Sequence, residues 1–214
     1  QNLPVTVVGM GAGVIYSTLG GTHHSQEDIA IAGAIPNMQI LAPCDPLECI
    51  EATRHCAQQK RGPIYLRIGK AGEPKLTEQA IEPFVFGKVR YLRRGKDVCI
   101  ISYGVIMKMA TEVADRLEAL GKSVSVISCH TVKPLDVDGI ANALKMHQKV
   151  IVIEEHAPQG GVAPQTKQIA WDIKAECDLH IFTLKDQFIH NYGSYEDLLS
   201  SHGLSVENIL DSVA

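Results

Sequence analysis

Short apolar runs alternate with helical segments along the whole chain, and this alternation limits the possible folds more than any other feature. It predicts an α/β protein whose sheets are mostly parallel. Several runs are apolar at nearly every position, as in Val98-Cys99-Ile100-Ile101, which indicates strands covered on both faces. The expected strands lie at 5–8, 38–41, 63–68, 98–101, 124–127, 150–153 and 181–184.

Helix signals occupy the segments between these strands. Asp45 is a good N-cap, Pro46 suits the first helical position, and Glu48 adds an acid in the first turn. Ser25 is expected to cap a helix that ends near Gly33. Further helices are expected at about 106–117, 137–146 and 161–173, with a short helical tail at the end.

A polar stretch from about residue 69 to 85 separates two α/β blocks. It contains glycines and prolines and has little periodicity, which is typical of a linker. The expected division is therefore a first unit at 1–75, a linker at 76–86 and a second unit at 87–214. The chain lacks an initiator Met and enters its first strand almost at once, so we expect that a preceding part is missing.

Composition excludes several classes of protein. The 20 Lys and Arg residues face 24 Asp and Glu, and a net charge of -4 argues against a nucleic-acid-binding surface. No apolar run is long enough to span a membrane. The six cysteines form no CxxC pair, so we expect free thiols, no metal site and a cytoplasmic location.

Several motifs occur in an order that resembles the transketolase family, which includes the 1-deoxyxylulose-5-phosphate synthases. The first is the Gly-rich loop Gly21-Thr22-His23-His24-Ser25-Gln26-Glu27-Asp28. The others are Ile35-Pro36-Asn37-Met38, Pro43-Cys44-Asp45, Pro63-Ile64-Tyr65-Leu66-Arg67, Gly95-Lys96-Asp97-Val98, Tyr103-Gly104, Lys133-Pro134-Leu135-Asp136, and Glu154-Glu155-His156 with Gly160-Gly161.

The resemblance implies a fold and a cofactor. Residues 1–75 resemble the later part of the family's pyrimidine-binding domain, and 87–214 resemble its complete C-terminal domain. The cofactor would be thiamine diphosphate with Mg²⁺ in the intact enzyme. Most of its site would lie outside this chain, in the diphosphate-binding domain and in the earlier half of the pyrimidine-binding domain. The chain alone is therefore expected to be inactive, and no residue of it is assigned to the cofactor.

Two residues are candidates for the site. By resemblance, His23 would be catalytic and would touch the substrate, since a histidine can exchange protons near neutral pH. The alternative is a loop histidine bonded to backbone. Arg67 would grip a substrate phosphate through its guanidinium fork, or it would form an ion pair with a nearby acid. A structural role with hydrogen bonds is predicted for His24, and a structural or interface role is expected for Glu154-Glu155-His156.

The chain departs from the family at two positions near this loop. Leu19 stands where the family has an Asp that binds a donor hydroxyl, and Gly11 stands where transketolases have a phosphate-binding His. These replacements put the usual sugar-phosphate specificity in doubt.

The resemblance implies a two-carbon ketol or acyl transferase that acts as a homodimer on a small phosphorylated sugar. Its cofactor-binding part would come from the same gene or from a separate subunit. Two alternatives remain open. One is the β subunit of a 2-oxo-acid dehydrogenase E1, and the other is a non-catalytic module for dimerisation or regulation.

Overall fold

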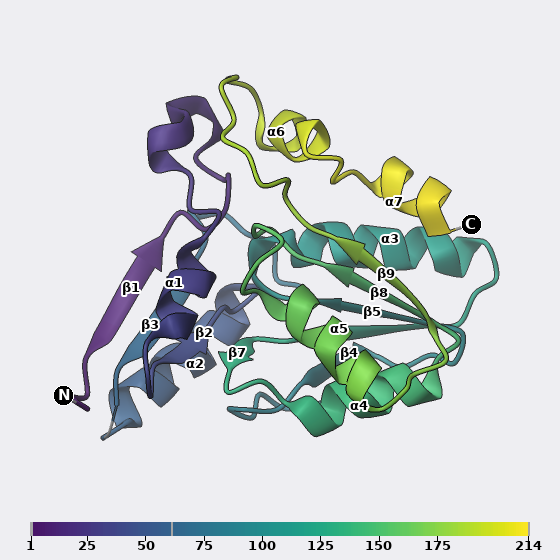
Figure 1. Cartoon of the computed structure of the whole chain (residues 1–214), viewed down its shortest axis with the longest axis horizontal. Helices are drawn as coiled ribbons and strands as arrows, with labels where there is room; N and C mark the ends of the chain where they lie inside the picture. Colours follow the sequence, from purple (N-terminus) through teal and green to yellow (C-terminus); the bar gives the residue numbers. More distant parts are fainter. Residues whose placement is uncertain (1, 61, 214) are drawn as a thin grey trace.

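The computed structural model describes residues 2–60 and 62–213 and contains two sheets side by side (Figure 1). Their strand orders are β1-β3-β2-β7 and β4-β6-β5-β8-β9. All pairings are parallel except β2 with β7 and β4 with β6, which confirms the predicted α/β class. The strands are β1 Thr6–Met10, β2 Gln39–Leu41, β3 Ile64–Ile68, β4 Arg90–Arg93, β5 Val98–Ser102, β6 Val124–Ser128, β7 Thr131–Lys133, β8 Lys149–Ile153 and β9 Asp178–Phe182.

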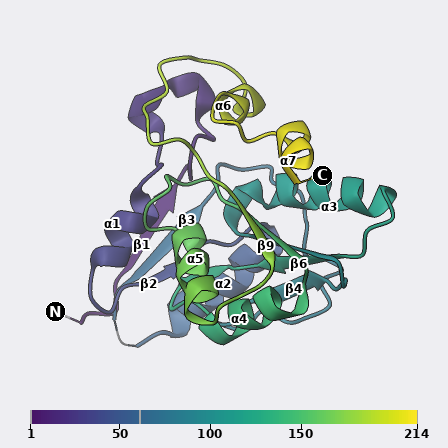
Figure 2. The same ribbon diagram turned by 45° about the vertical axis from the view of Figure 1, so that its right-hand side comes forward.

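Helices cover both faces of the five-stranded sheet. Figures 1 and 2 show α4 and α5 on one face, and α3 and α7 on the other. Short 3-10 turns occur at η1 Ser17–Leu19, η2 Gly21–His23 and η3 Gly104–Ile106. The helices are α1 Asp28–Ala34, α2 Pro46–Gln58, α3 Met107–Ala119, α4 Val137–Met146, α5 Val162–Asp172, α6 Tyr195–Ser201 and α7 Val206–Val213.

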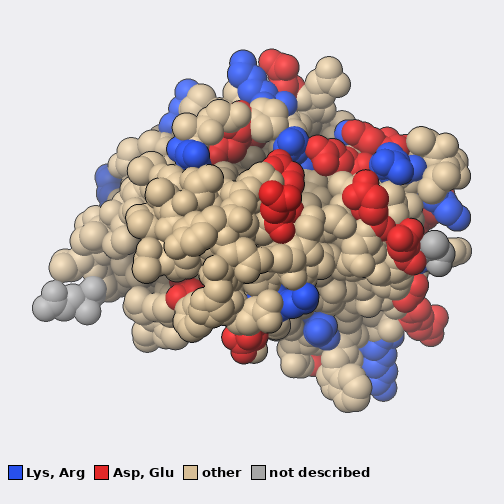
Figure 3. All heavy atoms as spheres, turned by 90° about the horizontal axis from the view of Figure 1, so that it is seen from above, with Lys and Arg blue, Asp and Glu red and all other residues tan. Residues whose placement is uncertain are grey.

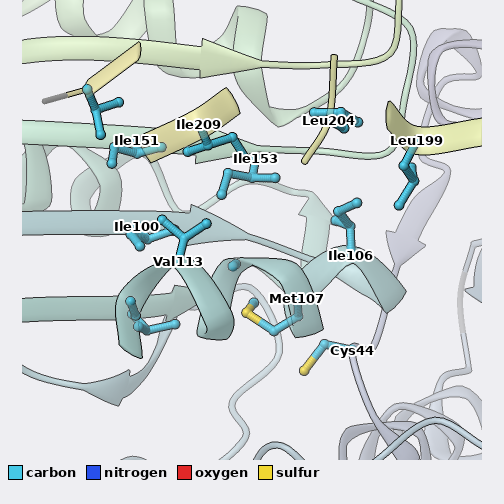
Figure 4. Close-up of a cluster of buried hydrophobic side chains, with 14 of the residues drawn as sticks. Cys44, Ile100, Ile106, Met107, Val113, Ile151, Ile153, Leu199, Leu204 and Ile209 are labelled. Carbon is cyan, nitrogen blue, oxygen red and sulfur yellow. The ribbon is translucent and has the colours of Figure 1, made fainter. Parts of the chain in front are cut away.

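The core of the second unit has two layers because side chains alternate across each strand. Ile100 and Ile151 point to the layer formed with α3, α6 and α7 (Figure 4). Cys99 and Ile101 point to the layer formed with α4 and α5. The C-terminal helices α6 and α7 are thus part of this core.

The first sheet takes a strand from the second unit. β7 pairs antiparallel with β2, with Ile40 opposite Lys133. The Lys133 ammonium also donates to the carbonyls of Gly33 and Ile35, at 2.7 and 2.8 Å. One sheet therefore contains strands from both of the expected units.

The connecting segment is held against α2 by one carboxylate. Asp45 accepts the Glu48 N–H at 2.7 Å, which confirms the predicted N-cap. Its second oxygen accepts the N–H groups of Leu76 and Thr77 at 2.9 and 2.7 Å. Asp45 therefore fixes the start of the expected linker.

Two sequence-based predictions of local structure were wrong. Glu27, and not Ser25, precedes the first turn of α1, and no side chain caps this helix. Ser25 instead exchanges two backbone hydrogen bonds with Gly13, at 3.1 and 2.8 Å. The last strand lies at Asp178–Phe182, earlier than the expected 181–184, because its parallel register is set by β8.

The outer edge of the first sheet is open. β1 pairs only with β3 among the described residues, and its side chains Val7, Val8 and Met10 are 50%, 54% and 63% exposed. From above, charged side chains gather mostly over the other half of the molecule (Figure 3). An exposed apolar edge strand of this kind is a ready surface for pairing with another segment.

Within residues 2–60 and 62–213, no helix is both long and apolar enough to cross a membrane.

Candidate functional site

The Gly-rich loop leaves the sheet at the carboxyl end of β1 and turns back to α1. Gly11 has φ +93, and a Cβ there would collide with the ring of Tyr16. The Tyr16 ring in turn lies 6.4 Å from the His23 ring at 74°. A glycine is therefore required at position 11, because φ is positive there and because the Tyr16 ring leaves no room for a Cβ.

His23 ends the short turn η2 and is exposed. The imidazole Nδ1 of His23 lies 3.1 Å from the hydroxyl oxygen of Thr22. The backbone N–H of His23 donates to the carbonyl of Gly20 at 2.9 Å. The imidazole is thus paired with a side chain, while the backbone bond holds the turn. Leu19, close to it in sequence, is 50% exposed. Lys70 is a charged neighbour of Tyr16, since its Nζ lies 5.9 Å from the Tyr16 ring centre.

His24 behaves differently from its neighbour. Both of its ring nitrogens are buried, and neither has a hydrogen-bond partner within the described part of the chain. Burial, followed by the nearby His23, lowers the pKa of His24, so the ring is neutral near pH 7. The ring of His24 therefore makes none of the predicted structural hydrogen bonds, although the backbone N–H donates to the Gly21 carbonyl at 3.4 Å.

Arg67 is buried at the end of β3, and its side chain is 1% exposed. Its Nε donates to the Asp28 carboxylate at 2.9 Å, and Nη2 donates to the carbonyls of Ser25 and Glu155 at 3.3 and 2.9 Å. This arrangement is the ion-pair alternative for Arg67. Because the guanidinium is enclosed by these partners, it presents no exposed face to a phosphate.

Asp28 is the acid of this pair and also accepts the Tyr65 hydroxyl at 2.7 Å. Burial by itself raises the pKa of Asp28. The Arg67 charge and the hydrogen bonds from Arg67 and Tyr65 outweigh this effect, so the pKa lies below its ordinary value. Asp28 is therefore ionised at neutral pH and binds the first turn of α1 to β3.

Glu154 follows β8 and turns toward its own unit. Its Oε2 accepts the Tyr103 hydroxyl at 2.9 Å and the Val162 N–H, at the start of α5, at 2.8 Å. Burial raises the pKa of Glu154 to about 7, although these hydrogen bonds act in the opposite direction. Glu154 therefore fixes the start of α5.

Glu155 turns the other way, toward the Gly-rich loop. Oε1 accepts the Val14 N–H at 2.6 Å, and Oε2 accepts the Tyr195 hydroxyl at 2.6 Å. Burial raises the pKa of Glu155 to about 7, opposed by the Arg67 charge and by these two hydrogen bonds. The two adjacent carboxyls thus have separate structural partners, which confirms the prediction for Glu154 and Glu155.

His156 completes this junction. Its Nε2 accepts the Ala30 N–H in the first turn of α1 at 3.4 Å, and its Nδ1 lies 2.9 Å from the Ala157 carbonyl. The carboxyl ends of β3 and β8 therefore meet where the Gly-rich loop returns to α1. Such convergent strand ends are a common position for ligand sites in α/β proteins.

Sequence reasoning missed Tyr16, Lys70 and Tyr195 as neighbours of this loop. Tyr195 lies 40 residues beyond Glu155, and no local motif marks the contact. Gly11 is the one available signal for Tyr16, because a glycine in a loop often marks a close approach.

The described residues do not form a complete metal site. No group of three or more His, Cys, Asp or Glu side chains within 2–60 and 62–213 could hold a metal ion. The donor set does not fit a Mg²⁺-bound diphosphate, because such an ion needs several oxygen ligands.

Comparison with known proteins identifies the family. Residues 87–209 match the family model "Transketolase, C-terminal domain", and residues 1–73 match "Transketolase, pyrimidine binding domain".

The relatives are bacterial enzymes and enzyme subunits. One subunit of an apulose-4-phosphate transketolase from Phocaeicola vulgatus is 30% identical over 96% of this chain and 64% of the relative. The subunit of the same name from Actinobacillus succinogenes is 28% identical over 99% of this chain and 67% of the relative. A 1-deoxy-D-xylulose-5-phosphate synthase from Alcanivorax borkumensis is 32% identical over 98% of this chain and 31% of the relative. The chain thus spans about two thirds of the transketolase subunits and about one third of the synthase.

Solved structures agree with this assignment. A split gene transketolase, described as an inactive beta4 tetramer, has a TM-score of 0.83 at 26% identity and covers 99% of this chain and 66% of that one. A transketolase from Campylobacter jejuni shares the fold, with a TM-score of 0.73 at 18% identity, over 97% of this chain and 31% of that one. This chain belongs to the transketolase family, whose members depend on thiamine diphosphate.

Proposed function

We propose that this chain is part of a thiamine-diphosphate-dependent transferase, and that the intact protein moves a two-carbon ketol or acyl unit between sugar-phosphate-like substrates. One observation carries the proposal: the family's loop histidine, His23, is exposed beside Tyr16, at a junction whose Arg67 and Glu155 are buried. The similarity to subunits of apulose-4-phosphate transketolases supports the reaction class.

In this proposal His23 is the catalytic residue that touches the substrate. An imidazole can hydrogen-bond a substrate hydroxyl and move its proton near neutral pH. The cofactor, when bound, supplies the carbon–carbon bond chemistry. Arg67, for which substrate binding was expected, does not contact the substrate in this proposal; it positions the end of the loop by donating to the Ser25 carbonyl at 3.3 Å.

The substrate differs from that of standard transketolases in this proposal. Leu19 places an apolar, half-exposed side chain where the family's Asp would bind a donor hydroxyl. Tyr16 fills the space beside Gly11, so no other side chain fits where the family has its histidine. Lys70 then offers an exposed cation close to Tyr16 for a phosphate, which we expect to be bound as a point charge.

The partner in this proposal is a cofactor-binding part, supplied by the same gene or by a separate subunit. The exposed apolar strand β1 supports it, since such an edge is stable when another segment pairs with it. Similarity to proteins that are named as transketolase subunits is a second support. We also propose that the intact enzyme is a homodimer and, from its six free cysteines, that it is cytoplasmic.

The test adds this chain to its separately produced cofactor-binding part with thiamine diphosphate and Mg²⁺. Transfer from a ketose phosphate to an aldehyde acceptor is measured. His23→Ala should lower kcat by about 100- to 10,000-fold. His180→Ala is the matched control, because His180 lies on β9 and pairs with Asp178. Normal turnover in His23→Ala would contradict the catalytic role.

Two other outcomes would select the alternatives. Activity only with a lipoyl acceptor would indicate the β subunit of a 2-oxo-acid dehydrogenase E1. Dimerisation without activity, whatever partner is supplied, would indicate a non-catalytic module.

A further inference from the structure

The loop that carries His23 is contacted from outside its own unit, by Glu155 and by the C-terminal segment. The C-terminal segment crosses over it, and α6 lies beside η1 in both ribbon views (Figures 1 and 2). A Cβ at Gly20 would lie 2.7 Å from the Tyr192 ring, and one at Gly21 would lie 3.4 Å from the Ile189 carbonyl oxygen. The loop therefore has little freedom to move toward the C-terminal segment.

Glu155 joins the two sides of this contact. One carboxyl oxygen accepts the N–H of Val14, in the loop, and the other accepts the hydroxyl of Tyr195, at the start of α6. Glu155 is 1% exposed and Val14 is fully buried, so the bond between them is shielded from water. A Cβ at Gly13 would collide with this carboxyl group, so the backbone must lie directly against it.

We propose that Glu155 and Tyr195 are positioning residues that hold the His23 loop in its reactive arrangement, a role that rests on the proposed function of His23. Neither residue touches the substrate. Glu155 fixes the start of the loop through Val14, and Tyr195 fixes Glu155. The C-terminal segment thereby sets the position of His23, although it contributes no reacting group.

The position of Val14 in the loop supports this role of Glu155. Val14 lies between Gly11, whose backbone makes room for Tyr16, and the turns that carry His23. Gly13 and Ser25 close the two ends of this loop by their paired backbone hydrogen bonds. A shift at Val14 would therefore move the whole segment between these two residues.

The adjacent pair of Tyr103 and Glu154 offers a matched control. It has the same chemistry, a buried tyrosine hydroxyl that donates to a buried carboxyl at 2.9 Å. Its carboxyl binds the start of α5 and not the loop. Tyr195→Phe and Tyr103→Phe remove the same group from neighbouring sites, and only the first should loosen the His23 loop.

Hydrogen exchange of the 214-residue chain tests the proposal without substrate or partner. Tyr195→Phe should speed exchange of the amides of Gly13, Val14 and His23 by about 10- to 100-fold. Exchange in the strands β5 and β8 should stay unchanged. Tyr103→Phe should leave the three loop amides at their original rates.

A second variant guards against a general loss of stability. Glu155→Gln keeps the side-chain volume and an acceptor for the Val14 N–H. The increase in hydrogen-exchange rate should therefore be confined to residues 11–24 and be smaller than that in Tyr195→Phe. The proposal is overturned if Tyr195→Phe leaves these rates unchanged, or if both tyrosine variants raise them equally. It is also overturned if both Tyr195→Phe and Glu155→Gln raise exchange throughout the chain.

Ketol transfer by the assembled enzyme separates this proposal from the proposed function. Tyr195→Phe should lower kcat more than it raises KM, and Tyr103→Phe should not. If Tyr195→Phe speeds exchange in the loop but the unmodified protein shows no ketol transfer, only the proposed function is contradicted.

Discussion

Replacing Arg67 by Met tests the buried ion pair that joins α1 to β3. Arg67 is 1% exposed and Asp28 13% exposed at the side chain, so the substitution leaves a nearly buried carboxylate without its cation. Removal of one partner from a buried pair costs about 3–5 kcal/mol of unfolding free energy. For a protein of this size, that corresponds to a fall in Tm of about 6–20 °C.

Thermal unfolding followed by circular dichroism measures this change. Arg93→Met is the matched control, because Arg93 is 37% exposed and pairs with surface acids, where the expected loss is about 0–1 kcal/mol. Adding Asp28→Asn to Arg67→Met should restore part of the loss, since the uncompensated charge is gone. A loss below about 1 kcal/mol for Arg67→Met, or strictly additive effects, would refute the argument.

Three further predictions concern other groups. Asp45→Ala removes an N-cap and the bonds to the linker, so unfolding free energy should fall by about 2–4 kcal/mol in chemical denaturation, with Glu51→Ala as a near-neutral comparison. The pKa values of Glu154 and Glu155 are raised to about 7 from the ordinary value of 4.5, so the folded state binds more protons than the unfolded state between these pH values. The unfolding free energy should therefore fall as pH rises through this window, by about 3 kcal/mol per residue. The fall should be less steep in Glu154→Gln and Glu155→Gln. An unchanged slope of unfolding free energy against pH in these variants would contradict the burial argument. Isothermal calorimetry on the 214-residue chain should detect no thiamine diphosphate binding, and micromolar affinity would contradict the assignment of most of the site to another part.

Much of the fold was predictable because its signals are local. Buried strands such as Val98–Ser102 are apolar on both faces, and this composition is visible without knowing their neighbours. The helix predicted at 137–146 was found at Val137–Met146, and Asp45 caps α2 as expected. The loop around His23 could likewise be named from its own residues.

Pairings over long sequence distances were not predictable in the same way. β7 has three residues, Thr131–Lys133, and it is a strand because β2, far earlier in the chain, offers an edge. The bounds of β9 follow the register of β8 and not its own apolar pattern. Ser25 has the composition of an N-cap, yet its backbone is held by Gly13.

The sequence by itself determined the α/β class, the order of the strands along the chain, the main helix starts and the loop that presents His23. Only the tertiary structure decided that Arg67 is paired with Asp28 and that Glu155 joins Val14 to Tyr195. The physical reason is the range of the interactions. Backbone propensity and side-chain periodicity act within a few residues, whereas the partner of a buried charge depends on which strand ends meet in space.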